Sequence, residues 1–313
     1  MEVAVGVPTF GRSETLRRCL QSLAEQETSI TQLIIGDQNS DDCATEVVND
    51  VSSQLPATVE LCILDRSSDE SLPGTRNAIL EACTEDILCY LDDDTVLPVD
   101  WSKAILEGYR HSSDPAAVGG PAVTVYPDGE PAVEILDTAE NQNVMNKYGE
   151  VKVEWDRWVP PQPVETDILP GGNMTYKTTK LDSIGGFDPK YGLNPAGEEF
   201  VPMIELQNKG ESLLYHPDAR VKHYDADFGG SEGDYDQSNY SYWFGRHHIR
   251  RNWYQLPGNF GICILRLCFW TSHLPAPAWK IISNSLINRD LGPLYWFAGY
   301  IDGLRYETGL PLP

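Results

Sequence analysis

The feature that most constrains the fold is a regular alternation of short apolar stretches with amphipathic ones over the first third of the chain. This alternation is typical of βαβ units, which build a largely parallel sheet flanked by helices. The first amphipathic stretch carries a stripe of leucines after Ser13, which we interpret as its N-cap. The expected strands cover residues 3–7, 32–35, 59–64 and 87–91, and the expected helices cover 13–26, 43–52, 74–83 and 99–109.

Polar residues follow each of the four expected strands. Open sheets of this kind bind ligands beyond the carboxyl ends of their strands. We therefore expect the four polar sets to meet at one edge of the sheet. They are Pro8–Arg12, Asp37–Ser40, Asp65–Arg66 and Asp92–Asp94.

The last of these sets is a run of three aspartates directly after an apolar stretch. Three neighbouring carboxylates repel one another unless they face water or a divalent cation. A bound metal explains the cluster best. The alternative is an acidic loop that caps the helix expected over 99–109.

Composition narrows the class of protein. Lys and Arg number 23 against 47 Asp and Glu, for a net charge of −24, which argues against binding nucleic acid through its phosphates. The hydrophobic content of 41% indicates a folded chain, and the acidity is typical of adaptation to high salt. Seven cysteines with no CxxC pair indicate neither a disulfide framework nor a zinc site. With no visible signal peptide in residues 1–7, we expect an intracellular protein.

The residues from 244 onward differ from the rest. They hold seven basic and three acidic side chains and four of the eight tryptophans. Their apolar runs, 262–270 and 294–301, are shorter than the roughly 18 residues that span a bilayer. This pattern predicts a segment that lies on a membrane surface, and the alternative is a tail that packs back onto the preceding domain.

Seven motifs occur in an order and spacing that resemble the inverting family 2 glycosyltransferases with the GT-A fold. They are Val7–Arg12, Ile35–Ser40, Gly74–Asn77, Asp92–Asp94, Gly171–Asn173, Gly185–Asp188 and Gly197–Glu199. The resemblance, over about residues 2–254, implies a mixed, mostly parallel sheet flanked by helices. It implies a catalytic domain over 1–243, with a nucleotide-binding half (1–121) and an acceptor half (122–243), followed by a helical, amphipathic tail over 244–313.

The resemblance also implies roles for the acidic triplet. Mn²⁺ or Mg²⁺ would be held by Asp94, with Asp92 and His223, and would stabilise the departing nucleoside diphosphate. Asp92 and Asp93 would reach the ribose, the sugar or metal-bound water. The alternative for His223 is a structural, hydrogen-bonded histidine.

Other motif residues would bind the donor. Arg76 would meet the base or the pyrophosphate, or else form a surface ion pair. Asp37 and Thr9 would hold the nucleobase, although Gln38 stands where relatives often have a second acid. The remaining donor-binding residues would be Pro8, Arg12, Gly171, Gly172 and Asn173.

Inverting transfer needs a base that removes the proton from the acceptor hydroxyl. The family places it at the second acid of a Glu-Asp pair, which here is Glu198-Glu199. The resemblance therefore implies Glu199 as the base and Glu198 as the next candidate. The alternative is that both glutamates merely favour the start of a helix.

Together these features predict a metal-dependent inverting glycosyltransferase that uses a UDP- or GDP-sugar. The expected acceptor is a lipid-linked saccharide, and the expected location is peripheral, on the cytoplasmic face of the cell membrane. The enzyme would resemble those that assemble glycans in salt-loving archaea. Two alternatives are a nucleotidyltransferase, although residues 6–9 lack its glycine-rich phosphate loop, and a non-catalytic module that binds sugar nucleotides.

Overall fold

The computed structural model describes residues 1–28, 30–68, 71–145, 151–189 and 197–224. The tail expected over 244–313 lies outside the described residues, so its helical, membrane-surface character stays a prediction. Within the described ranges, no helix combines the length and apolar character needed to cross a bilayer.

The first third of the chain folds as the alternation predicts. Each expected strand and helix is present, with ends shifted by at most a few residues. One detail of the prediction was wrong: Arg12, not Ser13, is the N-cap residue of the first helix, and it makes no side-chain capping bond. The elements are β1 (Val3–Thr9), α1 (Ser13–Ala24), β2 (Gln32–Asp37), α2 (Cys43–Ser52), β3 (Glu60–Asp65), α3 (Leu72–Ala82), β4 (Ile87–Leu91), β5 (Thr95–Val96) and α4 (Trp101–Tyr109).

The second part of the described chain is built from shorter elements. The sequence of the stretch 122–167 shows little periodicity and predicts an irregular segment, but its described residues contain four short strands. The elements are β6 (Ala117–Gly119), β7 (Ala122–Thr124), β8 (Val144–Met145), β9 (Val151–Lys152), β10 (Val164–Thr166), β11 (Asn173–Lys177), α5 (Thr178–Asp182), α6 (Phe200–Asn208), β12 (Leu213–Tyr215) and β13 (Val221–His223).

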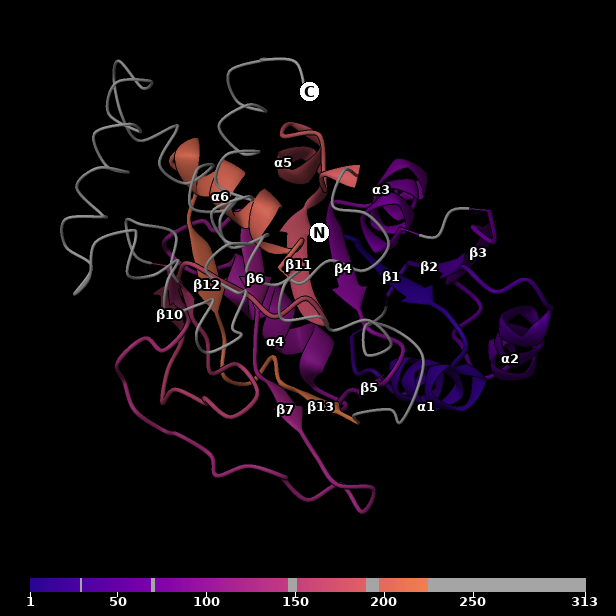
Figure 1. The fold of residues 1–313 in the computed structure, drawn as a ribbon, viewed down its shortest axis with the longest axis horizontal. Helices are drawn as coiled ribbons and strands as arrows, with labels where there is room; N and C mark the ends of the chain where they lie inside the picture. Colours follow the sequence, from indigo (N-terminus) through magenta and orange to yellow (C-terminus); the bar gives the residue numbers. More distant parts are fainter. Residues whose placement is uncertain (29, 69–70, 146–150, 190–196, 225–313) are drawn as a thin grey trace, which may run out of the picture.

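A central sheet of eight strands has the order β10-β12-β6-β11-β4-β1-β2-β3 (Figure 1). The pairs β4-β1, β1-β2, β2-β3 and β6-β12 are parallel, whereas β11 runs antiparallel to both β4 and β6, and β10 antiparallel to β12. The predicted mixed, mostly parallel α/β fold is confirmed. Strands from both expected halves of the catalytic domain share this sheet.

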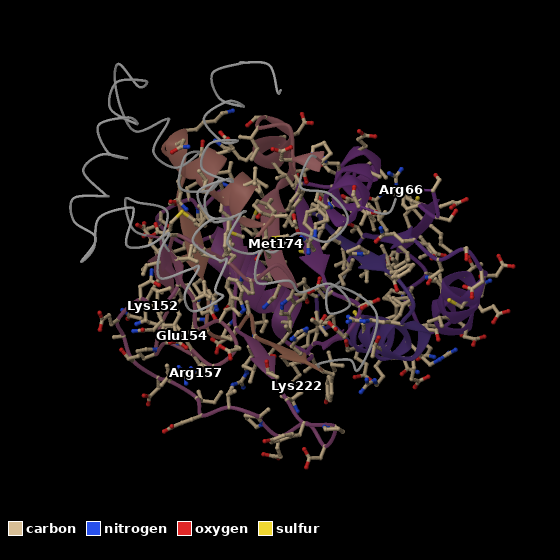
Figure 2. All side chains as sticks on the ribbon, viewed as in Figure 1. Arg66, Lys152, Glu154, Arg157, Met174 and Lys222 are labelled. Atoms are coloured by element: carbon tan, nitrogen blue, oxygen red, sulfur yellow. The ribbon has the colours of Figure 1, made fainter. Side chains whose placement is uncertain are left out.

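Side chains of alternate strand residues enter two separate cores, one on each face of the sheet. Val3, Val5 and Val7 of β1 pack with α1, α2 and α4, whereas Ala4 packs on the opposite face with residues of α3 and α6. Figure 2 places buried Met174 of β11 near the middle of the molecule and Lys222 toward the side that carries β7 and β13.

Two strand glycines let α3 approach the sheet closely. A Cβ on Gly6 would stand 2.3 Å from Ile79 of α3, and one on Gly36 would stand 2.4 Å from Thr75. Glycine inside a strand is typical of such an approach. Because the helix lies this close, the side chain of Arg76, the residue after Thr75, is buried beside the end of β4.

Candidate active site

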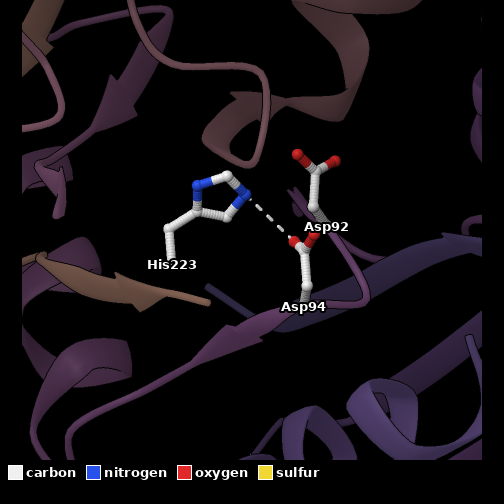
Figure 3. Close-up of side chains that lie close together, drawn as sticks. All are labelled: Asp92, Asp94 and His223. Atoms are coloured by element: carbon white, nitrogen blue, oxygen red, sulfur yellow. Dashed lines mark ion pairs between the residues drawn. The ribbon is translucent and has the colours of Figure 1, made fainter. Parts of the chain in front are cut away.

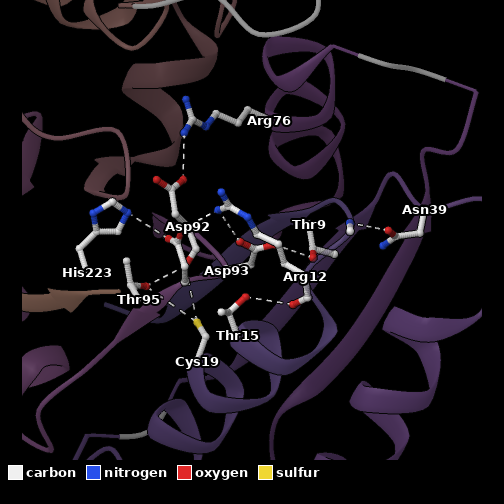
Figure 4. A network of polar contacts seen from close by, with 12 residues as sticks. Thr9, Arg12, Thr15, Cys19, Asn39, Arg76, Asp92, Asp93, Thr95 and His223 are labelled. Atoms are coloured by element: carbon white, nitrogen blue, oxygen red, sulfur yellow. Dashed lines mark hydrogen bonds and ion pairs between the residues drawn. The ribbon is translucent and has the colours of Figure 1, made fainter. Parts of the chain in front are cut away.

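The ends of β1, β2 and β4 are joined by side-chain hydrogen bonds (Figure 4). Thr9 donates through Oγ1 to Asp93 Oδ2 at 2.7 Å, and the amide of Gly11 donates to Asn39 Oδ1 at 2.6 Å. Asp37 Oδ1 in turn accepts from the Asn39 amide at 3.0 Å and from its side chain at 2.7 Å. The expected convergence at one sheet edge is therefore observed for these three strands.

Asp65, after β3, contributes differently. Its carboxylate is exposed and accepts hydrogen bonds from the amide and hydroxyl of Ser67, at 3.0 and 2.6 Å. Asp65 thus forms a local turn of its own. Asn39, which belongs to the expected polar set Asp37–Ser40 but was given no role of its own, links the loops instead. Its position two residues after Asp37 is the signal that could have identified it.

Asp92, Asp94 and His223 form a cluster in which one potential ligand atom of each lies within 4.8 Å of the others (Figure 3). His223 Nε2 lies 3.1 Å from Asp94 Oδ1. Backbone pairing brings them together, because β13 runs antiparallel to β5 with His223 opposite Thr95. The amide of Tyr224 also donates to the Asp94 carbonyl at 3.0 Å. A histidine more than a hundred residues away in sequence thus reaches the triplet by strand register.

This cluster fits a divalent cation in geometry. Two carboxylates and an imidazole are ordinary ligands of such ions, and bonds of about 2.1 Å would set opposite ligand atoms about 4.2 Å apart. The observed limit of 4.8 Å is close to that separation, so small side-chain rotations would bring all three atoms to an ion.

The charge of the cluster also fits a cation. Among the residues that the structure describes, the carboxylates of Asp92, Asp93, Asp94 and Glu198 form ion pairs with two guanidinium groups, those of Arg12 and Arg76. Burial would raise the pKa of Asp94, but the hydrogen bond and charge of His223 and the charge of Arg12 hold it below its ordinary value. Asp94 therefore stays ionised and available to a metal.

Asp93 differs from its two neighbours because it is not part of the cluster with His223. It is 4% exposed, and it accepts from Thr9 and faces Arg12 Nη1 at 3.4 Å. Desolvation and the adjacent charge of Asp94 raise the pKa of Asp93 to about 7. Through its hydrogen bond with Thr9, Asp93 connects the end of β1 to the loop after β4. Its predicted contact with the donor stays a prediction.

Arg76 is buried, so the interpretation of this residue as a surface ion pair was wrong. Its side chain is 3% exposed, and its guanidinium forms an ion pair with Glu198 and lies 3.5 Å from Asp92 Oδ1. It also donates to the carbonyl of Gly171 at 3.3 Å. Arg76 thus connects the acidic triplet to the glutamate pair before α6. Its place three residues before Ile79, on the buried face of α3, is the signal that could have indicated a buried side chain, although it does not identify the partners.

Two glycines create the space between these groups. A Cβ on Gly172 would stand 2.5 Å from Asp92 Oδ2, which no real side chain tolerates, whereas one on Gly171 would stand 3.5 Å from Arg76 Nη2 and 3.7 Å from Glu199 Cδ. Gly172 is therefore required by the position of Asp92. Gly171 lies between the arginine and the glutamate.

The two adjacent glutamates have different surroundings. Glu198 is 2% exposed and paired with Arg76, whereas Glu199 is only partly buried. Desolvation raises the pKa of Glu199 to about 7, against the opposing effects of a backbone hydrogen bond and of Arg76. Neither glutamate is a side-chain cap of α6, since Glu199 stands at the N-cap position without a capping bond. A glutamate with a pKa near neutrality suits a general base.

Asn173 has a side chain that serves the fold. It is fully buried, and its amide nitrogen donates to the carbonyls of Gly120, Pro121 and Ala219 at 3.1, 3.2 and 2.7 Å. Its Oδ1 accepts from Trp101 Nε1 at 3.0 Å. Any contact that this residue makes with a donor must therefore come from its backbone, as the preceding glycines would allow.

Two of the motifs, Gly74–Asn77 and Gly185–Asp188, contact each other in the structure. Asn77 of α3 accepts from the amide of Phe187 and donates to the carbonyl of the same residue, both at 2.8 Å. Gly186, with a φ of +71°, lies so close that a Cβ would meet Asn77 Oδ1 at 2.4 Å. This contact fixes Phe187, whose ring stacks 5.5 Å from the guanidinium of Arg76.

Comparison with known proteins places this site in a family. The model of glycosyl transferase family 2 matches residues 4–162, which include the acidic triplet, and the chain belongs to this family. It is 26% identical over 235 residues to the glucosyl-dolichyl phosphate glucuronosyltransferase of Haloferax volcanii, an alignment that spans 71% of this chain and 69% of that protein. The predicted class of enzyme, a glycosyltransferase, is thereby confirmed.

Solved structures agree on the fold. S. aureus TarS 1–349 in complex with UDP-GlcNAc superposes with a TM-score of 0.58 at 14% identity, covering 99% of this chain and 92% of that one. The Pyrobaculum calidifontis mannosyltransferase PcManGT, in complex with GDP-Man and Mn²⁺, superposes with a TM-score of 0.55 at 14% identity, covering 97% and 87%. A longer TarS structure is covered over 49% of its length. These likenesses confirm the GT-A fold.

Proposed function

We propose that this chain is a metal-dependent, inverting glycosyltransferase that moves a sugar from a UDP- or GDP-sugar to an acceptor hydroxyl. The observation that carries the proposal is that a cluster able to hold a divalent cation lies near a glutamate whose pKa is raised to about 7. Arg76 and Gly171 stand between them. The solved neighbours with UDP-GlcNAc and with GDP-Man and Mn²⁺ support a nucleotide-sugar donor.

Asp92, Asp94 and His223 would hold the ion, Mn²⁺ or Mg²⁺. When bound, such an ion stabilises the negative charge that grows on a departing diphosphate. Three residues support binding of the ion at this site. Arg12 and His223 keep the pKa of Asp94 below its ordinary value, so that it stays ionised. Gly172 leaves space for the side chain of Asp92. Pro8, Thr9 and Asp37, at the ends of β1 and β2, would face the nucleoside.

Glu199 would take the proton from the acceptor hydroxyl as it attacks the anomeric carbon from the face opposite the diphosphate. Glu198 is less suited to this task, because its carboxylate is already paired with Arg76. We therefore assign different roles to the two glutamates. Glu198 would hold Arg76 in position, and Glu199 would act as the base.

The acceptor we propose is a lipid-linked saccharide, at the cytoplasmic face of the membrane. The relative from Haloferax volcanii, named for action on glucosyl-dolichyl phosphate, supports this acceptor class. The excess of acidic residues in the same chain supports work at high salt. The basic, tryptophan-rich sequence from 244 onward supports peripheral contact with lipid.

A donor screen tests the proposal. UDP- and GDP-sugars are incubated with the full chain in molar salt, with Mn²⁺, with Mg²⁺ or with chelator, and release of the nucleoside diphosphate is followed. We expect slow, metal-dependent release from one donor class even without acceptor. Binding of a donor without any release would instead indicate a non-catalytic sugar-nucleotide-binding module.

A further inference from the structure

The positively charged side chain of Arg12 lies beside the carboxylates that would bind the cation. Its Nη1 lies 2.5 Å from Asp94 Oδ2 and 3.4 Å from Asp93 Oδ1, so a positive charge already sits on the acid best placed to bind the metal. His223 contacts the other oxygen of Asp94. A cation that approaches Asp94 therefore meets a carboxylate that faces a guanidinium at one oxygen and an imidazole at the other.

Arg12 lies at the edge of the site, where its side chain can face either the carboxylates or a ligand. The residue precedes α1 in a non-helical conformation and follows Gly11, which has a φ of +72° and open space where a Cβ would be. The guanidinium is 10% exposed, so it lies at the border of the site and not in its floor. A guanidinium fork also matches carboxylate and phosphate groups equally well.

We propose that Arg12 is an internal counterion of the metal site that is exchanged when the donor binds. Without a ligand it neutralises Asp94. When a divalent cation and a nucleoside diphosphate bind together, the contact between Arg12 and Asp94 would break. Asp94 would then bind the cation, and the guanidinium of Arg12 would contact a diphosphate oxygen. This inference rests on the proposed function, because it takes Asp94 as a metal ligand.

The exchange has a thermodynamic consequence. Arg12 opposes a cation that arrives alone, through charge repulsion and occupation of Asp94, but it favours a cation that arrives with phosphate. Metal and nucleotide should therefore bind cooperatively, each strengthening the other by the same factor. Loss of the charge at position 12 should remove both effects.

The test is a set of Mn²⁺ titrations on the full chain in molar salt, by calorimetry and by electron paramagnetic resonance of free Mn²⁺. Each is made without nucleotide, with UDP and with GDP. For Arg12→Gln we expect Mn²⁺ alone to bind more tightly by about tenfold or more, because one repelling charge at close range has been removed. The strengthening of Mn²⁺ binding by UDP or GDP should fall by a similar factor.

Two further variants serve as controls. Arg17→Gln removes the same charge from the next turn of α1, where Arg17 pairs with Asp50 at 2.9 Å and is 31% exposed, and it should change neither measurement. Arg12→Lys keeps the charge and should leave the affinity for Mn²⁺ alone near that of wild type. Circular dichroism verifies that each variant is folded.

Different failures have different meanings. If wild type binds Mn²⁺ but Arg12→Gln binds it with equal or lower affinity, the exchange is wrong while the metal-dependent function stands. If wild type binds no Mn²⁺ with or without nucleotide, both the exchange and the proposed metal dependence are wrong.

Discussion

Replacing Glu199 by glutamine gives the sharpest prediction about the chemistry. The carboxamide keeps the shape of the side chain but cannot accept the acceptor proton, and general-base catalysis typically contributes about 10²–10⁴ in rate. We expect turnover to fall by about 10²-fold or more, with donor affinity within a factor of about three of wild type. Donor affinity should persist because the cation cluster and the loops after β1 and β2 are untouched.

The raised pKa adds a pH signature to this prediction. With a pKa of about 7, the ionised fraction of Glu199 rises from about 9% at pH 6 to about 91% at pH 8, so wild-type turnover should rise about tenfold over this interval. An ordinary, exposed glutamate is ionised across the whole interval and would give a flat profile. In Glu199→Gln the residual activity should lose this rise.

The assay follows release of the nucleoside diphosphate at saturating donor in molar salt, with donor binding measured by calorimetry on the same preparation. Glu211→Gln is the control, because Glu211 is a partly buried glutamate paired with Lys180 at 2.6 Å on the edge of the molecule. A Glu199→Gln variant as fast as wild type would refute the assignment and make Glu198 the next candidate. A wild-type profile that is flat between pH 6 and pH 8 would contradict the raised pKa.

Three other perturbations test separate parts of the account. Gly172→Ala should weaken Mn²⁺ binding by about tenfold or more, because its Cβ would displace Asp92, whereas Gly171→Ala meets only ordinary contacts and should be tolerated; equal effects would contradict this reasoning. Asn173→Ala should lower the free energy of unfolding in denaturant by about 3 kcal/mol, since it leaves buried partners unsatisfied, against less than about 1 kcal/mol for Asn141→Ala, whose hydrogen bond to the carbonyl of Glu165 is exposed. The full chain should float with liposomes in high salt and a chain ending at Tyr242 should not; if neither floats and the shorter chain unfolds, the tail is part of the core.

The parallel part of the fold could be predicted because its signals are local. Each strand from β1 to β4 contains an apolar run, and the helices α1 and α2 each carry a stripe of apolar residues. The short strands β6, β11 and β12 gave no comparable signal. β11 is a strand because it pairs with both β4 and β6, a long-range condition that no window of sequence contains.

The candidate site was predictable in its residues but not in its connections. The rule that ligands gather at the carboxyl ends of parallel strands located the loops after β1, β2 and β4. It could not reveal that Arg76 is an interior ion pair or that Asn173 is committed to the fold, because both depend on partners from distant segments. His223 was placed by family resemblance, and strand register explains how it arrives there.

The central claim is that Asp94 is the ligand through which a divalent cation recruits the donor diphosphate. The most direct measurement is a calorimetric titration of UDP and GDP, with and without Mn²⁺, into wild type and Asp94→Ala. If Asp94 binds the cation, one nucleotide should bind to wild type in a Mn²⁺-dependent manner, and this binding should be lost in a folded Asp94→Ala protein. Undiminished, Mn²⁺-dependent affinity in that variant would contradict the account.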